Sequence, residues 1–576
     1  LNIILDKMTK LKIDYLKTNM VDLSVLGKQY DNESNDTNYN PYRIQNLQLY
    51  NPIYERFFAM NDSNYNSITL NHKNTIVDLN TVSNDNQLFD QKIFVKFSPL
   101  LDPYRYMIGK YDVDDSRIKT LPSLTSSDES VHPKISTIHN ASYVDSFFCF
   151  LTSIVLNKYD IPHGIDYYGS YLGLQEKHRL NIADDVEYLR TSDFFNDNIG
   201  KYFHIEDNNN DSFTNPFLGL NSSRKNKQKL NIDDSEKILF ECEELSEIKM
   251  VDNDYTNDLE SIYSKSHSSS VTSSASSTSS DSSTSSVNYS SDEDSKEDSE
   301  EDSEEDSEED SEEDSEEEEE LYGYIHNFPI QMICMEKCDG TLDELFVKDE
   351  MDTQNGTSML MQVIMMLLIY QKMFKFTHND LHTNNIMYIN TEQQYLFYTF
   401  EKKTYKIPTY GKIYKIIDFG RSIYKLNEHT FCSDSFSKEG DAATQYNCEP
   451  FFNDKRPRLE PNNSFDLCRL GSSLFDFVMD IEDKEKDLDD FQKTIQRWCL
   501  DDNGKNILYK KNGQERYPDF KLYKMIARTV HNHTPEAQLE YNLFKQFIMN
   551  TEMDTNDKNI NIDELPVLFN QTNSSV

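Results

Sequence analysis

A long run of serine and acidic residues in the middle of the chain sets the strongest limit on how this sequence can fold. Residues 264–291 are almost all Ser and Thr, and residues 291–320 repeat the unit Ser-Glu-Glu-Asp. Such a segment has very few apolar side chains to bury, so it cannot offset the entropy lost on ordering. We therefore expect a disordered tract at 264–320, with the folded core built from the segments before and after it.

Nearly half of the chain's negative charge belongs to that tract. Residues 291–320 hold 22 Asp or Glu and one Lys, a net of −21, against −44 for all 576 residues. A chain without a basic face is not expected to bind nucleic acid, whereas a basic protein is a fitting partner or substrate. Two interpretations of the tract stay open: a solvated spacer, or a target of kinases that select serines followed by acidic residues.

The remaining composition predicts an intracellular protein. Eight cysteines show no zinc-ligand spacing, which is typical of reduced thiols. The first residues are too short and too charged for a signal peptide, and no run approaches the ~18 apolar residues of a membrane helix. The most apolar stretch, Met359–Tyr370, is expected to be a buried helix, and we expect no membrane association.

Strand-like and helical patterns divide the ordered parts of the chain. The predicted strands lie at 67–70, 74–79, 92–97 and 328–337. The predicted helices lie at 139–157, at 357–375 and between about 462 and 550. Strands first and helices later indicate an α+β fold in two lobes.

Two short passages carry the chemistry. FTHNDLHTNNIMYI, residues 376–389, joins an apolar helix to a strand-like run, and KIIDFGRSI, residues 415–423, ends a strand in Asp-Phe-Gly. Phosphoryl transfer needs an oriented nucleophile and metal ions that neutralise the phosphate charge. A carboxylate such as Asp380 can orient the attacking hydroxyl, and the oxygens of Asn385 and Asp418 suit Mg²⁺. These passages therefore predict phosphoryl transfer that depends on ATP and magnesium.

The same residues resemble a known family. Asp380 and Asn385 fall on the pattern H-R-D-L-x-x-x-N, and the tripeptide that begins at Asp418 matches D-F-G. The chain thus resembles the eukaryotic-type protein kinase superfamily. The forms HNDLHTNN and IIDFGRSI make it most similar to the serine/threonine protein kinases of giant DNA viruses of the mimivirus type. The resemblance implies a bilobal fold with a small β-rich N-lobe and a larger helical C-lobe.

The resemblance also assigns residues to nucleotide binding. Lys96 in IFVK is similar to the V-A-I-K lysine that pairs with the α- and β-phosphates. Asp145 is its candidate helix partner, in place of the usual Glu. ICMEKCDGTLDEL looks like the last N-lobe strand and the hinge, which would make Met335 the gatekeeper. Backbone groups of Glu336 and Cys338 would then bond to adenine.

A further segment, NSFDLCRLGSSLF, resembles the kinase helix in which a buried Asp holds the catalytic loop, and Asp466 and Gly471 take the family positions. The implied organisation is an irregular extension at 1–60, the first part of the N-lobe at 61–172, an insertion at 173–326, the last N-lobe strand and hinge at 327–338, the C-lobe at 339–550 and a tail at 551–576.

Three departures from the family pattern keep other functions open. No G-x-G-x-x-G precedes Lys96, so the phosphates need a different cover. Asn379 stands where regulated kinases carry an Arg that reads a phosphorylated activation loop, so we expect activity without that phosphorylation. His382 replaces the catalytic-loop lysine, as in phosphotransferases of the aminoglycoside and choline kinase type.

The expected function is transfer of the γ-phosphoryl group of ATP to a protein hydroxyl, with serine/threonine specificity. Two alternatives remain: a small-molecule phosphotransferase of the same fold, and a pseudokinase that acts as a scaffold. The residues assign no oligomeric state. A viral kinase of this type would act in the host cytoplasm or be carried in the virion.

Overall fold

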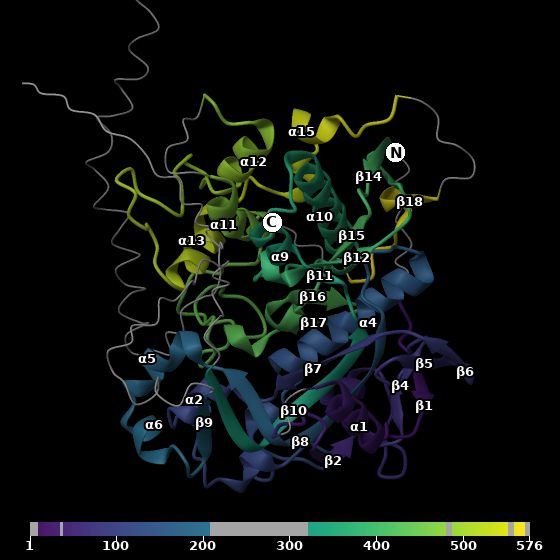
Figure 1. Ribbon diagram of the computed structural model, residues 1–576, viewed down its shortest axis with the longest axis vertical. Helices are drawn as coiled ribbons and strands as arrows, with labels where there is room; N and C mark the ends of the chain where they lie inside the picture. Colours follow the sequence, from purple (N-terminus) through teal and green to yellow (C-terminus); the bar gives the residue numbers. More distant parts are fainter. Residues whose placement is uncertain (1–9, 35–37, 208–320, 480–485, 551–557, 571–576) are drawn as a thin grey trace, which may run out of the picture. The chain divides into compact units, whose positions relative to one another are not determined.

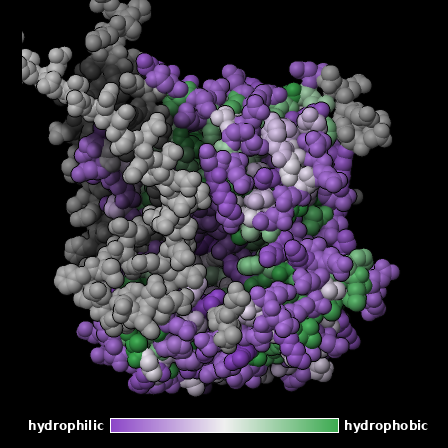
Figure 2. Space-filling model, viewed as in Figure 1, coloured by the Kyte–Doolittle hydropathy of each residue, from purple (hydrophilic) through white to green (hydrophobic). Residues whose placement is uncertain are grey.

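The computed structural model describes residues 10–34, 38–207, 321–479, 486–550 and 558–570, and these form a mixed α+β structure (Figure 1). The tract at 264–320 lies outside the described residues, so its disorder stays a prediction. Apolar side chains fill the interior, and the face in Figure 2 is dominated by hydrophilic residues with scattered apolar patches.

One antiparallel sheet carries the residues expected to bind a nucleotide. Its strands run in the order β2 (Ile44–Gln48), β8 (Tyr167–Asn181), β10 (Leu321–Glu336) and β7 (Ile93–Pro99), and β9 (Phe203–Asp207) also pairs with β10. The strands expected at 92–97 and 328–337 are therefore confirmed. In the β7–β10 register Lys96 lies opposite Ile333, and Phe94 lies opposite Met335.

The helix expected at 139–157 is α4 (Ala141–Tyr159), which contacts β8 and β10. The side chain of Asn140 caps its N-terminus by accepting a hydrogen bond from the N–H of Ser142. Asp160 ends the helix in the left-handed conformation. Because α4 is buried over most of its length, its Asp145 is only 4% exposed.

The N-terminal residues are more regular than expected. In place of the irregular chain expected at 1–60, the described part holds β1 (Tyr15–Lys17), α1 (Leu23–Glu33), β2 and a 3₁₀ turn at Pro52–Arg56. β1 pairs with β3 (Ile68–Leu70), and β2 joins the main sheet. These elements are short and are stabilised by docking onto the sheet, so their own periodicity is weak.

The insertion expected at 173–326 is shorter at both ends. β8 continues to Asn181, and the short helices α5 (Val186–Arg190) and α6 (Asp193–Asn198) follow before β9. β10 already begins at Leu321. Residues 175–181 are mostly polar, but they pair in register with the first half of β10. Pairing with a strand that is distant in sequence overrides the weak local pattern.

A separate small sheet precedes β7, at the position where the family has its glycine-rich loop. It consists of β4 (Thr75–Asp78), β5 (Thr81–Asn84) and β6 (Gln87–Asp90). Asp85 and Asn86 form the turn between β5 and β6, with φ of 47° and 65°. Asn and Asp tolerate this left-handed backbone better than most residues, so the hairpin turns tightly without glycine.

The chain after β10 is built around α10 (Thr353–Phe374), which matches the helix expected at 357–375. By length and composition α10 could cross a membrane, but 89% of its apolar window is buried inside the protein, as in the core helix of a globular protein. Lys375 ends α10 with φ 50°, and the passage that carries Asp380 follows at once.

Several of the strands in this part of the chain are short, and β14, β15 and β16 contact α10. β11 (Gly340–Thr341), β12 (Ile386–Asn390) and β15 (Lys412–Ile416) form one sheet, and β13 (Tyr395–Phe400) pairs with β14 (Lys403–Pro408). β16 (Ile423–Leu426) and β17 (His429–Cys432) form a hairpin after Asp418. The helices in this part of the chain are α9 (Leu342–Val347), α11 (Phe465–Val478), α12 (Asp490–Trp498), α13 (Lys521–Thr529), α14 (Pro535–Gln538) and α15 (Asn542–Lys545).

The C-terminal residues 558–570 are docked, although a tail was expected at 551–576. β18 (Asn559–Asn561) pairs in parallel with β13. The Lys372 ammonium donates to the backbone oxygens of Ile562 and Asp563 at 2.7 and 2.8 Å, and Leu568 is 1% exposed. The segment was missed because backbone contacts, which sequence patterns do not reveal, hold it in place.

Candidate functional site

The passage that carries Asp380 is held by a buried carboxylate on α11. The backbone N–H groups of His378 and Asn379 donate to the two oxygens of Asp466 at 2.9 and 2.8 Å. Asp466 is fully buried, and burial raises its pKa despite these bonds. The side chain that the family resemblance assigns to the catalytic loop therefore contacts that loop directly.

His378 links the loop to the strand that leads to Asp418. Its Nε2 lies 2.9 Å from the carbonyl oxygen of Ile417, and its Nδ1 accepts from the N–H of Asp380 at 3.2 Å. The N–H of Ile417 in turn donates to the carbonyl of Asn385 at 3.0 Å. With both ring nitrogens engaged and no exposed surface, His378 braces the backbone.

Asn385 and Asp418 emerge at the same end of one strand pair. Ile386 at the start of β12 lies opposite Ile416 at the end of the antiparallel β15, so the residues beside them meet at that edge. The Asn385 side-chain nitrogen donates to the carbonyl of Asp380 at 2.9 Å and contacts His382 Nε2 at 3.1 Å. This orientation leaves the amide oxygen of Asn385 for a ligand.

Lys96, Asp145 and Asp418 form one charged cluster. The Lys96 ammonium lies 2.7 Å from Asp145 Oδ2 and 2.9 Å from Asp418 Oδ1. The other oxygen of Asp145 accepts the backbone N–H of Phe419 at 2.8 Å. Asp145 therefore joins β7 to the Asp-Phe-Gly turn through two bonds, and the shorter side chain does not prevent contact with Lys96.

The charges in this cluster shift one another's pKa values. Burial acts to lower the pKa of Lys96, but the two carboxylates outweigh it and raise the pKa overall. Burial raises the pKa of Asp145. For Asp418 the Lys96 ammonium outweighs the desolvation by the surrounding protein and lowers the pKa. Asp418 is also 46% exposed, so it is the anionic member of the cluster that can reach a ligand.

The residues expected to form the hinge are held by contacts of the Glu336 side chain. Glu336 accepts from the N–H of Asp166 at 2.8 Å and pairs with the ammonium of Lys415, a side chain that is 1% exposed. Lys415 also donates to the carbonyl of Gly164 at 2.7 Å. This buried ion pair fixes the end of β10, and nothing in the local sequence pattern indicated it.

The backbone groups at the hinge fit the expected adenine contacts in part. The N–H of Glu336 already donates to the carbonyl of Asp166 at 2.9 Å, which leaves only its carbonyl for a ligand. No described residue hydrogen-bonds the N–H or carbonyl of Cys338. Met335 is 8% exposed at the end of β10. Phe94, which lies opposite Met335 and on the same face of β7 as Lys96, is 49% exposed.

Sequence reasoning missed the groups around Asp380. Tyr523 on α13 donates its hydroxyl to Asp380 Oδ1 at 2.6 Å, and Arg421 Nη1 lies 3.7 Å from Oδ2. Arg469 Nε donates to the Tyr523 hydroxyl at 2.9 Å. The Arg421 guanidinium also pairs with Asp441. Arg421 and Arg469 each lie three residues after a motif Asp, but no spacing rule links Tyr523 to either.

Asn379 makes neutral contacts where a regulated kinase would carry Arg. Its side-chain nitrogen donates to the carbonyl of Arg421 at 3.0 Å, and its oxygen accepts the Tyr446 hydroxyl at 2.8 Å. Arg528 donates to the carbonyl of Thr444 at 2.6 Å. The segment after Asp418 is thus tied to the loop and to α13 without any phosphate group.

Among the described residues, no group of three or more His, Cys, Asp or Glu side chains is placed to hold a metal ion by itself. The expected magnesium ligands, Asn385 and Asp418, supply two hard oxygens from neighbouring strand ends. Mg²⁺ commonly takes one or two protein ligands together with phosphate oxygens and water. The donor set therefore suits a magnesium ion that arrives with a nucleotide, and it does not suit a dedicated protein cage.

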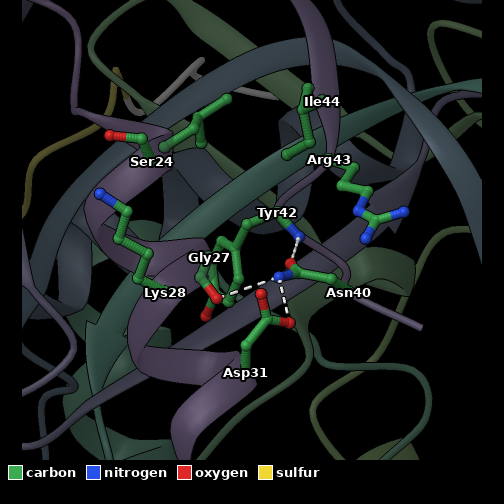
Figure 3. A pocket seen from close by; sticks show the side chains of 9 residues that line it. Ser24, Gly27, Lys28, Asp31, Asn40, Tyr42, Arg43 and Ile44 are labelled. Atoms are coloured by element: carbon green, nitrogen blue, oxygen red, sulfur yellow. Dashed lines mark hydrogen bonds between the residues drawn. The ribbon is translucent and has the colours of Figure 1, made fainter. Parts of the chain in front are cut away.

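A hollow of about 300 Å³ lies elsewhere, between α1 and β2 (Figure 3). Asn40 spans it by donating to the carbonyl of Gly27 at 3.0 Å and to Asp31 at 2.8 Å. Tyr42, which lines the hollow, packs on Phe97. Because Phe97 and Lys96 are neighbours on a strand, their side chains point to opposite faces of the sheet. This hollow is therefore not part of the Lys96 site.

The chain shows limited similarity to known proteins. No protein-family model matches the chain. An uncharacterized protein, 098R of Invertebrate iridescent virus 6, is 27% identical over 177 residues, which are 30% of this chain and 26% of that protein. The chain thus matches about a quarter of that relative's length.

Proposed function

We propose that this chain is an ATP-dependent protein kinase, with serine/threonine specificity and a bilobal kinase-like arrangement. The observation that carries the proposal is that Lys96 contacts both Asp145 and Asp418, 2.7 and 2.9 Å away. Asp380 and Asn385 lie on a loop bonded to the same strand end through Ile417. A cation for phosphates, oxygens for magnesium and a carboxylate for the acceptor are what phosphoryl transfer requires.

The proposed lobes follow the domain boundaries expected from the sequence, except that both lobes include additional segments. The N-lobe would comprise the main sheet and α4, and it would include β2, β8 to Asn181 and all of β10. The C-lobe would comprise residues 339–550, with the docked segment 558–570 added to it. Glu336 and Cys338 would form the hinge between them.

Each residue has a distinct task in the proposed reaction. Magnesium, when bound with the nucleotide, neutralises phosphate charge. Lys96 would hold the α- and β-phosphates, and Asp145 fixes its ammonium. Asn385 and Asp418 would direct oxygens at the metal ion. Asp380 would accept a hydrogen bond from the acceptor hydroxyl and orient it for attack.

Nucleotide binding would use the hinge and the adjoining strand. The free backbone groups of Cys338 suit the edge of adenine, and the half-exposed ring of Phe94 offers an apolar surface beside it. The Asp85–Asn86 hairpin stands in the place of a glycine-rich loop. This difference predicts weaker backbone contact with the phosphates than a glycine loop provides.

The proposal is tested by incubating the purified chain with labelled ATP, Mg²⁺ and a mixed protein extract. Asp380→Asn removes the carboxylate and keeps its shape, and Asp490→Asn serves as a control because Asp490 is 71% exposed on α12. We expect labelled proteins with the unmodified chain and with Asp490→Asn, and a loss of about 100-fold or more with Asp380→Asn.

Two results would contradict the proposal. Equal labelling by the unmodified chain and Asp380→Asn would remove the claim to catalysis and favour a pseudokinase scaffold. Label that appears only in small molecules would place the chain with the small-molecule phosphotransferases, which His382 also permits.

A further inference from the structure

A chain of hydrogen bonds reaches Asp380 from two helices that lie far from it in the sequence. Arg469 on α11 donates through Nε to the Tyr523 hydroxyl at 2.9 Å, and this hydroxyl donates to Asp380 Oδ1 at 2.6 Å. The hydroxyl thus accepts one bond and donates another. Linked bonds of this kind polarise each other, and a bond to a carboxylate is stronger than one between neutral groups.

The ring of Tyr523 is fixed as firmly as its hydroxyl. It is 3% exposed, it stacks on Phe520 with ring centroids 5.3 Å apart, and it lies 6.2 Å from the ring of Phe465. The guanidinium groups of Arg469 and Arg421 lie 5.1 and 5.6 Å from the ring centroid. A ring held between two cations and two aromatic side chains has little freedom to turn its hydroxyl away.

We propose that Tyr523, held by Arg469, is a positioning residue that binds one oxygen of Asp380 and so directs the other oxygen at the phosphoryl acceptor. The inference rests on the proposed function. Oδ2 lies 3.7 Å from Arg421 Nη1, which is beyond hydrogen-bond distance, so Oδ2 is the oxygen that can take a new donor. The acceptor hydroxyl would occupy that position.

The proton affinities agree with this assignment. Burial acts to raise the pKa of Asp380, but Arg421, His382, Arg469 and the Tyr523 hydrogen bond together lower it. Burial raises the pKa of Tyr523 to about 12, so its hydroxyl keeps its proton at neutral pH.

Tyr523→Phe tests the proposal because it removes only the hydroxyl. We expect kcat to fall about ten-fold, with the KM for ATP unchanged, because a hydrogen bond to a charged group is lost. A loss confined to kcat separates the positioning of Asp380 from a general loss of structure, which would also raise the KM for ATP. Arg469→Lys, which keeps the charge but loses the fixed Nε–H, should lower kcat by less.

Tyr509→Phe is the matched control, since the Tyr509 hydroxyl also donates to an aspartate, Asp476, at 2.9 Å but lies outside the site. It should leave kcat and the KM for ATP as they are. An unchanged kcat in Tyr523→Phe would overturn the proposal, and so would an equal loss of kcat in Tyr509→Phe.

A second measurement separates this inference from the proposed function. Thermal unfolding of Tyr523→Phe, Asp380→Asn and the double variant forms a double-mutant cycle that does not require activity. Additive effects on the melting temperature would show that Tyr523 and Asp380 do not interact. This result would overturn the inference whether or not the chain transfers phosphoryl groups. An unmodified chain that transfers no phosphoryl group at any pH would instead overturn the proposed function, even if the cycle shows coupling.

Discussion

The Asp380 loop and the Lys96 strand reach the same site by different means. The loop is bonded to Asp466 and Ile417 within the second half of the chain, through backbone groups that a short motif can specify. Lys96 meets its partners only because β7, α4 and the end of β15 come together from distant segments. A loop held by backbone hydrogen bonds needs a fixed spacing of residues, which a short sequence motif can reveal. A strand that is positioned by its register needs only one residue of the right type, and its sequence pattern is therefore weaker.

The Asp380 loop and the Lys96 strand also differ in the residues that surround them. The Asp380 loop has buried partners on several sides, including Tyr523 and Tyr446. The Asp85–Asn86 hairpin precedes Lys96 in the sequence, at the position where the protein kinase pattern has glycines. The difference teaches that, if the proposed reaction holds, the groups placed at the reacting atoms are more constrained in their spacing than the groups placed over the nucleotide.

The largest expected effect comes from Asp418, which contacts Lys96 and follows the strand end to which the Asp380 loop is bonded. Asp418→Asn should lower phosphoryl transfer by about three orders of magnitude, because it weakens metal binding and the contact with Lys96 together. Rates with labelled ATP would measure this, beside Asp490→Asn.

Chelation of Mg²⁺ should abolish transfer in every variant without changing the melting temperature. Transfer that persists in chelator would contradict the magnesium assignment.

The next effect is on stability and concerns the hinge. Lys415→Met should destabilise the protein by about 3–5 kcal/mol, because it leaves the Glu336 carboxylate without its cation in a buried position. Lys403→Met is the control, since Lys403 pairs with Glu540 at the surface, and it should cost about 0–1 kcal/mol. Denaturant unfolding measures both. Equal losses would show that the hinge does not depend on this pair.

A smaller effect tests whether Lys96 and Asp145 act as one unit. Each of Lys96→Met and Asp145→Asn should lower kcat/KM about 100-fold, because either change removes the held ammonium. The double variant should be little worse than either single variant, since both changes remove the same interaction. Steady-state kinetics at varied ATP would measure this. Additive losses would mean that Asp145 serves only the Asp-Phe-Gly turn.

A modest effect is expected where the loop meets the segment after Asp418. Tyr446→Phe removes the hydroxyl that donates to Asn379 at 2.8 Å and should cost about 1 kcal/mol of stability. Thermal unfolding would detect this. A much larger loss would indicate that the ring, which packs on Phe436 and Phe465, has rearranged.

The smallest expected effect is none at all. Phosphatase treatment should leave the activity unchanged, because the contacts of Asn379, Arg421 and Arg528 order the segment after Asp418 without phosphate. The assay compares rates before and after treatment. A large loss of activity would contradict the interpretation of Asn379 and point to a phosphate elsewhere in that segment.

Much of the fold and the site could be predicted because the signals are local. The strand with Lys96, the helix with Asp145 and the apolar helix before Asp380 have clear periodicity, and the structure contains all three. The early elements β1, α1 and β2 and the docked β18 could not be predicted, because their stability comes from contacts that they make elsewhere. The polar second half of β8 was missed for the same reason.

The sequence by itself determined which chemical groups are available: the carboxylates, amide and lysine that phosphoryl transfer needs, at spacings that a short loop or strand can present. Only the tertiary structure decided which of them meet. It paired Lys96 with Asp145, anchored Glu336 on Lys415, and brought Tyr523 and Arg469 to Asp380. The physical reason is that side-chain contacts between distant segments depend on register and packing, and no local pattern of residues encodes either.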